Sequence, residues 1–527
     1  MRTILILGAG IMQVPAIRIA RRKGWRVVVA DGNPSAMARD MADVFATVDL
    51  KDRDGLVRLA EECRGNGGLD GIFTAGTDFS SSVAWVAERL GLPGIGFETA
   101  MRATDKVLMR EALAKAGVPS PAFALWTGDR DPRSLLGGPL DFPLVVKPVD
   151  NMGARGVRRV DDPEGLVEAC ARAIELSRTR RVIVERFMVG PELSLDAVVA
   201  GGAVTVCGVA DRHIFFPPSF VEMGHTMPTS LDAATTRRIE EVFIAGIHAL
   251  GIDNGAAKGD IKLTREGPMV GEIAARLSGG YMSGWTFPLS SGVEVTEAAL
   301  NVAVGLAPGD LTPTLRRTSA ERALISIPGV VDAVIGVEEA RRLPGVVEVF
   351  MRVKPGDEVV FPSNNVEKCG NVIAVADTRA EAVALAEGAL AGMLVRLRPL
   401  TDRTTRYLFE ESGNDAFEGY PPTAVDALPV TRGEPAGLSP DDPVPVLPLP
   451  SASAQTTDWY GGSLDAAARS ALHRGNGRLD GGDGGFALGR LFWRAITRAG
   501  TQGGVYVLDS VREAARRGRL KELIAAL

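Results

Sequence analysis

The chain is poor in cysteine and histidine, with only four of each among 527 residues. Cys63, Cys170, Cys207 and Cys369 lie far apart and form no paired spacing, which argues against a disulfide framework or a zinc cluster. We expect them to be small, reduced core residues. No Ser/His/Asp or Cys/His arrangement stands out, so the sequence predicts no nucleophile supplied by the protein.

An excess of positive charge is also lacking. Lys and Arg number 59 against 65 Asp and Glu, a net charge of −6 with both signs interspersed, which disfavours binding to nucleic acid or to an anionic membrane. The most apolar late segment, LFWRAITRAGTQGGVYVLD, is interrupted by Arg494 and Arg498 and is not expected to span a membrane. MRTILILGAG enters a strand without a charged leader, so we expect no signal peptide and a cytoplasmic location.

The apolar content of 46% is ample for several cores, and the patterning predicts α/β and α+β units. In residues 1–105, strands at TILIL, WRVVVADGNP and GIFTAG alternate with helices at 14–22, 54–64 and 79–90. This alternation predicts a small parallel sheet covered by helices.

The Gly8-Ala-Gly10 turn and Asp31 suggest a dinucleotide-binding fingerprint. However, Gln13 occupies the third glycine position, where a side chain prevents the close helix packing that such a site needs. We therefore favour a structural turn over an NAD site.

The remaining chain divides into further predicted units. Residues 106–205 form a small α+β module with strands PLVVKP, VRRV, RVIVERF and ELSLDAVV, and residues 206–315 carry the hairpin AAKGDIKLT–REGP–MVGEIAAR. An α/β unit follows at 316–400. Residues 401–456 read as a connector with a proline-rich linker, and 457–527 as a tail with a RLDGGDGGF loop and helical segments that dock on the body or on a partner.

An ordered series of residues between Lys147 and Arg276 points to a nucleotide triphosphate. A lysine at a strand end is a charge for phosphate oxygens, and the loop Asn151–Val157 can lay backbone N–H groups against phosphates. Asp260 and Glu272, on the two strands of a predicted hairpin, suit a hard cation that bridges phosphates.

With these motifs the chain resembles the ATP-grasp superfamily over residues 1–400. The stretches TDFSSSVAWVAERLGLPG, RATDKVLMREALAKAGVPSPAF and GEIAARLSGGYMSGW look most like carboxylate–amine ligases of the L-amino-acid-ligase type. The resemblance implies a pre-ATP-grasp parallel-sheet domain, a two-part ATP-grasp clamp and a C-terminal α/β cap. It also implies ATP and Mg²⁺ as cofactors, with Mn²⁺ as a substitute.

Residue roles follow from that resemblance. Lys106 and Lys147 would contact phosphates, covered by a flexible loop at 151–157. Glu185 and Phe187 would lie at the adenine edge, and Glu192 would accept hydrogen bonds from the ribose. The full set comprises the nucleotide-binding Lys106, Lys147, Met152, Gly153, Ala154, Arg155, Gly156, Glu185, Phe187 and Glu192, the metal ligands Asp260 and Glu272, and the catalytic Arg276 and Lys262.

Two features leave alternatives open. Ala274 stands where the family usually has a metal-binding Asn, so either Glu272 bridges two ions alone or Lys262 supplies the missing charge. Purely structural roles are the other alternative. Glu192 could merely form a salt bridge with Arg186. Asp260 and Glu272 could pair with Lys258, Lys262 or Arg276 in a structural network.

The substrate pocket is expected in a loop between Phe216 and the helix that follows Leu231. Arg212, Glu222 and His225 are its candidate residues, against ordinary loop contacts as the alternative.

The predicted activity is that of an Mg-ATP-dependent carboxylate–amine ligase acting through an acyl phosphate. A carboxylase of the biotin-carboxylase or purine-biosynthesis type, a non-catalytic nucleotide-binding protein and an NAD-dependent enzyme are the alternatives. The expected partners are small-molecule carboxylate and amine substrates, with no nucleic acid and no membrane. A homodimer is left open.

Overall fold

The computed structural model describes residues 1–410, 484–519 and 522–523. Two compact units divide the chain, one of residues 1–320 with 376–379 and the other of residues 321–375 with 380–527. The predicted proline-rich linker and the body of the RLDGGDGGF loop lie outside the described residues. Among the described helices, none combines the length and the apolar character that crossing a membrane requires.

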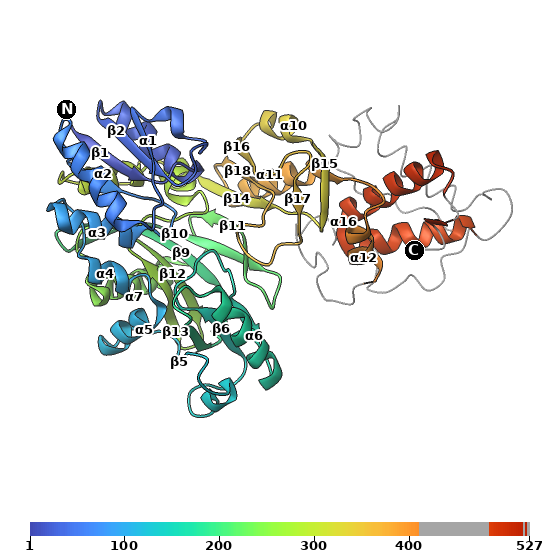
Figure 1. Cartoon of the computed structure of the whole chain (residues 1–527), viewed down its shortest axis with the longest axis horizontal. Helices are drawn as coiled ribbons and strands as arrows, with labels where there is room; N and C mark the ends of the chain where they lie inside the picture. Colours follow the sequence, from blue (N-terminus) through green and yellow to red (C-terminus); the bar gives the residue numbers. More distant parts are fainter. Residues whose placement is uncertain (411–483, 520–521, 524–527) are drawn as a thin grey trace. The chain divides into compact units, whose positions relative to one another are not determined.

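The first unit begins with the predicted parallel sheet, in the strand order β3-β2-β1-β4. Figure 1 labels β1 and β2 of this sheet, drawn in blue near the N-terminus. Its strands are β1 (Thr3–Leu7), β2 (Arg26–Asp31), β3 (Val44–Thr47) and β4 (Gly71–Phe73). Alternate residues of β1 enter two cores, because α1 (Val14–Arg22) packs with Ile4 and Ile6 while α2 (Arg53–Gly65) and α3 (Ser80–Leu90) pack with Leu5 and Leu7. Strand β3 and the short α4 (Phe97–Arg102) are additions to the predicted pattern.

The glycine turn after β1 is closed by the protein's own side chains. A Cβ placed on Gly8 would lie 3.0 Å from the Gln13 side chain, whose amide donates to the Ala75 carbonyl at 2.5 Å. Asp31 accepts a hydrogen bond from the Ala9 backbone N–H at 2.7 Å. This bond occupies an oxygen of the carboxylate that would bind the ribose in a dinucleotide site. These contacts support the structural turn over a dinucleotide site.

A small antiparallel sheet follows, in the order β5-β8-β6-β7. It consists of β5 (Phe123–Trp126), β8 (Val182–Arg186), β6 (Leu144–Pro148) and β7 (Arg158–Val160), and α6 (Pro163–Leu176) packs on it. Helix α5 (Lys106–Lys115) precedes it, and the segment VPSPAF, with its two prolines, leads directly into β5.

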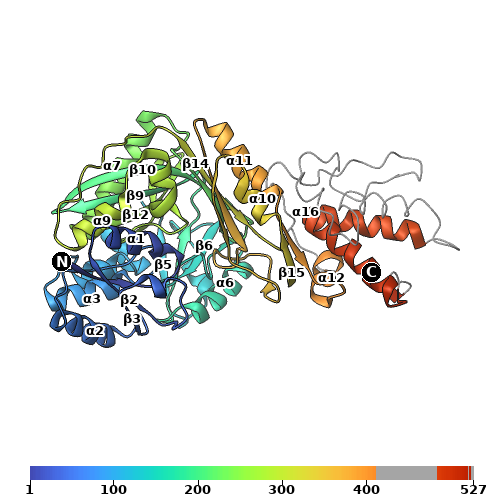
Figure 2. The ribbon, with the colours of Figure 1, turned by 90° about the horizontal axis from the view of Figure 1, so that it is seen from above.

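Five antiparallel strands form the larger sheet of the first unit, in the order β13-β12-β9-β10-β11. They are β13 (Gly267–Ala274), β12 (Gly255–Thr264), β9 (Glu192–Ala200), β10 (Ala203–Phe215) and β11 (Val221–Met227), and α7 (Ala233–Leu250) packs against them (Figure 2). The predicted β12–β13 hairpin is confirmed. Strand β9, which the sequence pattern grouped with the small module, pairs with β10 and β12 in this sheet instead.

The two faces of this sheet differ in chemistry because side chains alternate along each strand. Leu193, Leu195 and Ala197 of β9 join the core under α7. Glu192, Ser194 and Asp196 point to the other face, opposite Lys262, Asp260 and Lys258 of β12. The site residues of β9 and β12 therefore project from one side of this sheet.

Helices α8 (Phe287–Ser291) and α9 (Val295–Ala303) continue the first unit. The second unit contains two sheets, β14-β18-β16 and β17-β15-β19. Their strands are β14 (Thr318–Leu324), β15 (Gly329–Ile335), β16 (Val346–Met351), β17 (Glu358–Val359), β18 (Gly370–Ala376) and β19 (Leu394–Leu397), and the helices are α10 (Val337–Arg342), α11 (Arg379–Ala391), α12 (Asp402–Phe409) and α16 (Gly484–Arg516).

Helix α16, which belongs to the tail, packs on β19 and α12 within the second unit. Asp509 accepts two hydrogen bonds from Arg396 of β19, at 2.8 and 2.7 Å. The buried Gln502 donates to the Ser326 hydroxyl and the Val395 carbonyl, at 2.7 and 2.8 Å. The described part of the tail thus shares a core with the β19 region.

Candidate nucleotide and metal site

A cleft in the first unit gathers most of the predicted nucleotide and metal residues. Its lining includes Ile214, Phe220 and Gly271 together with Asn151. The predicted residues that line it are Lys106, Lys147, Met152, Gly153, Ala154, Glu185, Phe187, Glu192, Arg212, Asp260, Lys262 and Glu272. Arg155, Gly156, Glu222, His225 and Arg276 are not among its lining residues.

Lys106 reaches the cleft because helix α5 begins there. The Asp105 carboxylate caps the helix by accepting from the N–H groups of Val107 and Leu108, at 2.9 and 3.1 Å. The buried Lys106 ammonium donates to the Asn151 carbonyl at 2.7 Å, and so contacts the start of the glycine loop.

Lys147 and Glu185 form a buried ion pair in the small sheet. Lys147 shares a face with Val145, which lies opposite Glu185 on β8, and the Lys147 Nζ to Glu185 Oε2 distance is 2.6 Å. Arg110 contacts the other oxygen of Glu185 at 2.8 Å and donates to the Gly271 carbonyl at 2.7 Å. Burial raises the pKa of Glu185, but Arg110 and Lys147 outweigh it and hold the pKa below its usual range.

The glycine loop has the backbone that its sequence predicts. Gly153, Ala154 and Gly156 all have positive φ angles, of 67°, 61° and 75°. A Cβ on Gly156 would lie 2.8 Å from Leu176 and 3.0 Å from the Pro148 ring, so glycine is needed there for space as well.

Asp260 and Glu272 are directly paired across the β12–β13 hairpin. Burial works against the charge of Glu272, but Lys106, Lys258, Lys147 and Arg276 outweigh it and lower its pKa to about 2. Burial likewise opposes the ionisation of Asp260, and Arg212 with Lys258 lowers its pKa. Both carboxylates are therefore ionised at neutral pH.

These residues fit Mg²⁺. The ion prefers carboxylate oxygens and is usually held by one or two of them together with water and substrate phosphates. Asp260 and Glu272 supply two adjacent ionised carboxylates in one cleft with the phosphate-binding candidates Lys106 and Lys147. Among the described residues no group of three or more His, Cys, Asp or Glu side chains forms a metal cage.

Glu192 lies among cations on the polar face of the sheet. Its two oxygens contact Lys262 at 2.8 Å and Arg212 at 3.1 Å. The structural alternative of a Glu192–Arg186 pair is wrong, because Arg186 pairs with Glu266 at 2.8 Å. Lys262 also lies 4.8 Å from the centre of the Phe187 ring.

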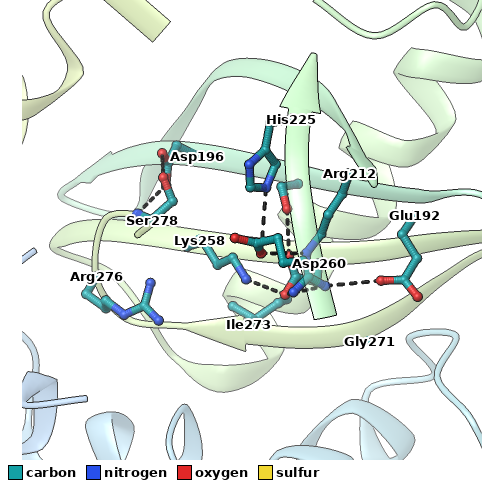
Figure 3. A network of polar contacts seen from close by, with 12 residues as sticks. Glu192, Asp196, Arg212, His225, Lys258, Asp260, Gly271, Ile273, Arg276 and Ser278 are labelled. Atoms are coloured by element: carbon teal, nitrogen blue, oxygen red, sulfur yellow. Dashed lines mark hydrogen bonds and ion pairs between the residues drawn. The ribbon is translucent and has the colours of Figure 1, made fainter. Parts of the chain in front are cut away.

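The charge beside Ala274 comes from Lys258 and not from Lys262. Lys258 is the cross-strand neighbour of Ala274, and its ammonium contacts the Asp260 carboxylate (Figure 3). The Lys262 ammonium turns instead to Glu192. The hypothesis that Lys262 replaces the missing Asn is therefore corrected in favour of Lys258.

The three substrate candidates lie together, but on strands instead of in the expected loop. Arg212 of β10 pairs with His225 of β11. The Glu222 carboxylate contacts Arg212 Nε at 2.9 Å and His225 Nε2 at 3.7 Å. Arg212 also contacts Asp260 at 3.3 Å, so it joins the substrate candidates to the metal candidates.

Arg276 lies in the loop after β13, held by backbone carbonyls. Its Nε donates to the Thr77 carbonyl and its Nη1 to the Leu277 carbonyl, both at 2.9 Å. Figure 3 shows it at the end of the network near Lys258, away from Arg212. It contributes to lowering the pKa of Glu272, which places its charge near the metal candidates.

The sequence reasoning missed Arg110, Asp196 and Lys258 as site residues. Arg110 follows Lys106 by one helical turn, a spacing that puts both on one side of α5 and is a usable signal. Asp196 and Lys258 share the alternation of Glu192 and Asp260 along their strands, which the sequence also contains.

Comparison with known proteins agrees with this geometry. Residues 140–284 match the family model of the ATP-grasp domain, and residues 322–398 match that of the L-amino acid ligase C-terminal domain 2. Over residues 140–284, which include most of the cleft's lining, the chain is thus similar to ATP-grasp domains.

The relatives narrow the class. The L-arginine-specific L-amino acid ligase of Bacillus subtilis is 24% identical over 321 residues, which is 60% of this chain and 77% of that protein. Human carnosine synthase 1 is 29% identical over 335 residues, 58% of this chain but only 40% of that protein. The crystal structure of L-amino acid ligase from Bacillus licheniformis superposes with a TM-score of 0.66 at 22% identity, covering 76% of this chain and 99% of that one.

Together these findings confirm the predicted resemblance to ATP-grasp carboxylate–amine ligases. They also confirm the predicted class, an ATP-dependent ligase that forms carbon–nitrogen bonds. The predicted cofactors ATP and Mg²⁺ agree with the match to the ATP-grasp domain and with a structural neighbour, a biotin carboxylase domain of Hydrogenobacter thermophilus at 17% identity, which was solved in complex with MgADP.

Proposed function

We propose that this protein joins the carboxylate of one amino acid to the amino group of a second through an acyl phosphate, with release of ADP and phosphate. The observation that carries the proposal is the single cleft in which Lys106 and Lys147 lie beside the ionised pair Asp260 and Glu272. The names of the relatives, which include an L-amino acid ligase and an alanine–anticapsin ligase, support amino-acid substrates.

The chain's own residues would perform the chemistry by position and charge. Lys106 and Lys147 hold phosphate oxygens, and the loop at 151–157 covers them and excludes water, which protects the acyl phosphate from hydrolysis. Glu192 faces the ribose and Phe187 the base. Bound to Asp260 and Glu272, Mg²⁺ would neutralise charge on the transferring phosphate.

Activation is needed because a free carboxylate is a poor electrophile. Attack of its oxygen on the γ-phosphorus forms the acyl phosphate and breaks the bond to ADP. The amine then attacks the acyl carbon and expels phosphate. Arg276, with a guanidinium that suits phosphate oxygens, would stabilise the charge that develops on the transferring group.

The substrate end is assigned to the cluster of Arg212, Glu222 and His225. A carboxylate such as Glu222 attracts the ammonium of an amino acid, and His225 Nε2 lies 3.7 Å from it. This cluster meets the metal candidates through Arg212, so a substrate bound there lies near the γ-phosphate.

Further parts of the proposal rest on the sequence. We place the protein in the cytoplasm and expect no partner beyond small molecules and a second copy of the chain. The divisions at residues 105, 315, 400 and 456 remain its proposed domain limits, whereas the limit expected at residue 205 moves to before β9, because β9 belongs to the larger sheet.

The test is a screen of purified protein with Mg-ATP and pairs of amino acids, read as ADP release and as amide product by mass spectrometry. We expect ADP and amide in equal amounts for some pairs, and loss of both in Glu272→Ala. ADP release that needs bicarbonate but no amine would favour a carboxylase, and ATP binding without turnover over a broad panel would favour a nucleotide sensor.

A further inference from the structure

A buried carboxylate lies next to the loop that carries Arg276. Asp196, in the middle of β9, has no exposed surface, and its oxygens accept from one residue, Ser278. The Ser278 N–H donates to Oδ1 at 2.9 Å and the Ser278 hydroxyl donates to Oδ2 (Figure 3). Burial raises the pKa of Asp196 to about 6, so placing a carboxylate here costs free energy that the two hydrogen bonds and nearby cations offset in part.

The loop at 275–280 is fixed on its other side by residues 75–77, which follow β4 of the parallel sheet. The Leu277 carbonyl accepts from the Gly76 N–H at 3.2 Å, and Ala75 and Leu277 form a parallel bridge. Arg276, between these anchors, donates to the Thr77 carbonyl. One short loop is therefore held from β9 through Ser278 and from residues 75–77 through Leu277 and Arg276.

The position of Asp196 argues for more than packing. It projects from the polar face of the sheet, next to Lys258 in the pairing of β9 with β12, and not into the apolar core under α7. Lys258 and Arg276 both favour the charged form of Asp196, and the same two cations lower the pKa of Glu272 in the cleft. An alanine pair could fill the space, but it could not fix the loop by two directional hydrogen bonds.

We propose that Asp196 and Ser278 are positioning residues, which hold the loop at 275–280 so that the Arg276 guanidinium stays beside Glu272, a residue that lines the cleft. The inference rests on the proposed function, because it assumes that Arg276 contacts the transferring phosphate. A misplacement of about 1 Å in such a group can cost roughly 100-fold in rate.

A double-mutant cycle tests the pairing. Ser278→Ala and Asp196→Ala should each lower kcat about 10- to 100-fold while the affinity for a non-hydrolysable ATP analogue changes less than about twofold. In an Arg276→Ala background, Ser278→Ala should cause no further loss. Ser82→Ala, which removes a buried hydroxyl that donates to the Leu50 carbonyl, is the matched control and should retain full kcat. Additive losses, or normal kcat in Ser278→Ala, would overturn the proposal.

A second measurement does not depend on turnover. Hydrogen exchange of the peptide that covers residues 275–281 should be faster in Ser278→Ala and Asp196→Ala than in the unaltered protein or Ser82→Ala. Unchanged exchange would overturn the positioning role even if the substrates are never found. If exchange rises while the unaltered protein forms no amide, the proposed function fails and the anchoring of the loop stands.

Discussion

Lys258 lies directly opposite Ala274 in the pairing of β12 with β13, and its ammonium contacts the carboxylate of Asp260. A protein cation therefore occupies the neighbourhood where a third metal-binding side chain would otherwise stand. It lowers the pKa of both Asp260 and Glu272.

This relationship predicts competition between Lys258 and a divalent ion. Lys258→Met should tighten Mn²⁺ binding in the absence of nucleotide by about tenfold. The substitution removes a positive charge that pairs with the Asp260 carboxylate and repels the metal ion. Electron paramagnetic resonance of free Mn²⁺ measures this directly. Lys262→Met is the matched control, since its ammonium pairs with Glu192, and equal affinities in the two variants would contradict the account.

The glycine loop gives a second matched pair. Gly156→Ala adds a Cβ that meets Leu176 and the Pro148 ring at a positive φ, whereas Gly153→Ala has the same φ problem but open space. We expect roughly a tenfold or greater rise in the Kd for ATP in the first variant. The second should change less, because it carries only the strain of about 1–2 kcal/mol for a left-handed residue. Calorimetric titration distinguishes them, and identical affinities would show that the contact with Pro148 has no role.

The buried pair of Arg110 and Glu185 predicts a stability effect. Arg110→Met leaves a buried carboxylate with Lys147 as its remaining ion-pair partner and should destabilise the protein by about 3–5 kcal/mol. Arg186→Met breaks an exposed pair with Glu266 and should cost less than about 1 kcal/mol. Thermal unfolding compares the two variants, and a similar small shift in Tm for both would refute the burial argument.

Asp196 predicts a pH dependence. Its folded pKa of about 6 exceeds the unfolded value of about 3.9, so the folded state keeps a proton that the unfolded state loses. Its contribution is present in full below the unfolded pKa and is lost as pH rises through about 6. The Tm of the unaltered protein should therefore fall relative to that of Asp196→Asn between pH 4 and pH 7, and a constant difference over this range would contradict the shift.

Much of the fold was predictable, because β1 and β2 are continuous apolar runs and glycine-containing turns follow them. Strand β11 was missed because Pro217, Pro218 and Pro228 bracket VEMGHTM and Gly224 interrupts it, a pattern typical of a loop. Strand β5 was missed for the same reason, as prolines precede it.

The site was predictable where its residues lie in a recognisable order along the chain. The positions of Lys147, the glycine loop, Asp260 and Glu272 could be predicted from the ends of the strands and from the hairpin alone. The partnership of Lys258 with Ala274 depends on the register of β12 and β13, which shifts at a bulge between Asp260 and Ile261. The contact of Asp196 with Ser278 joins residues 82 apart in sequence, and no local pattern determines it.

Oxygen-isotope transfer tests the central claim, an acyl phosphate formed from the substrate acid, most directly. An amino acid labelled with ¹⁸O in its carboxylate is incubated with protein, Mg-ATP and the acceptor amine, and the released phosphate is analysed by mass spectrometry. The account predicts one ¹⁸O atom in each phosphate released, because the acid oxygen bonded to phosphorus leaves with it. Amide formation with unlabelled phosphate would contradict it.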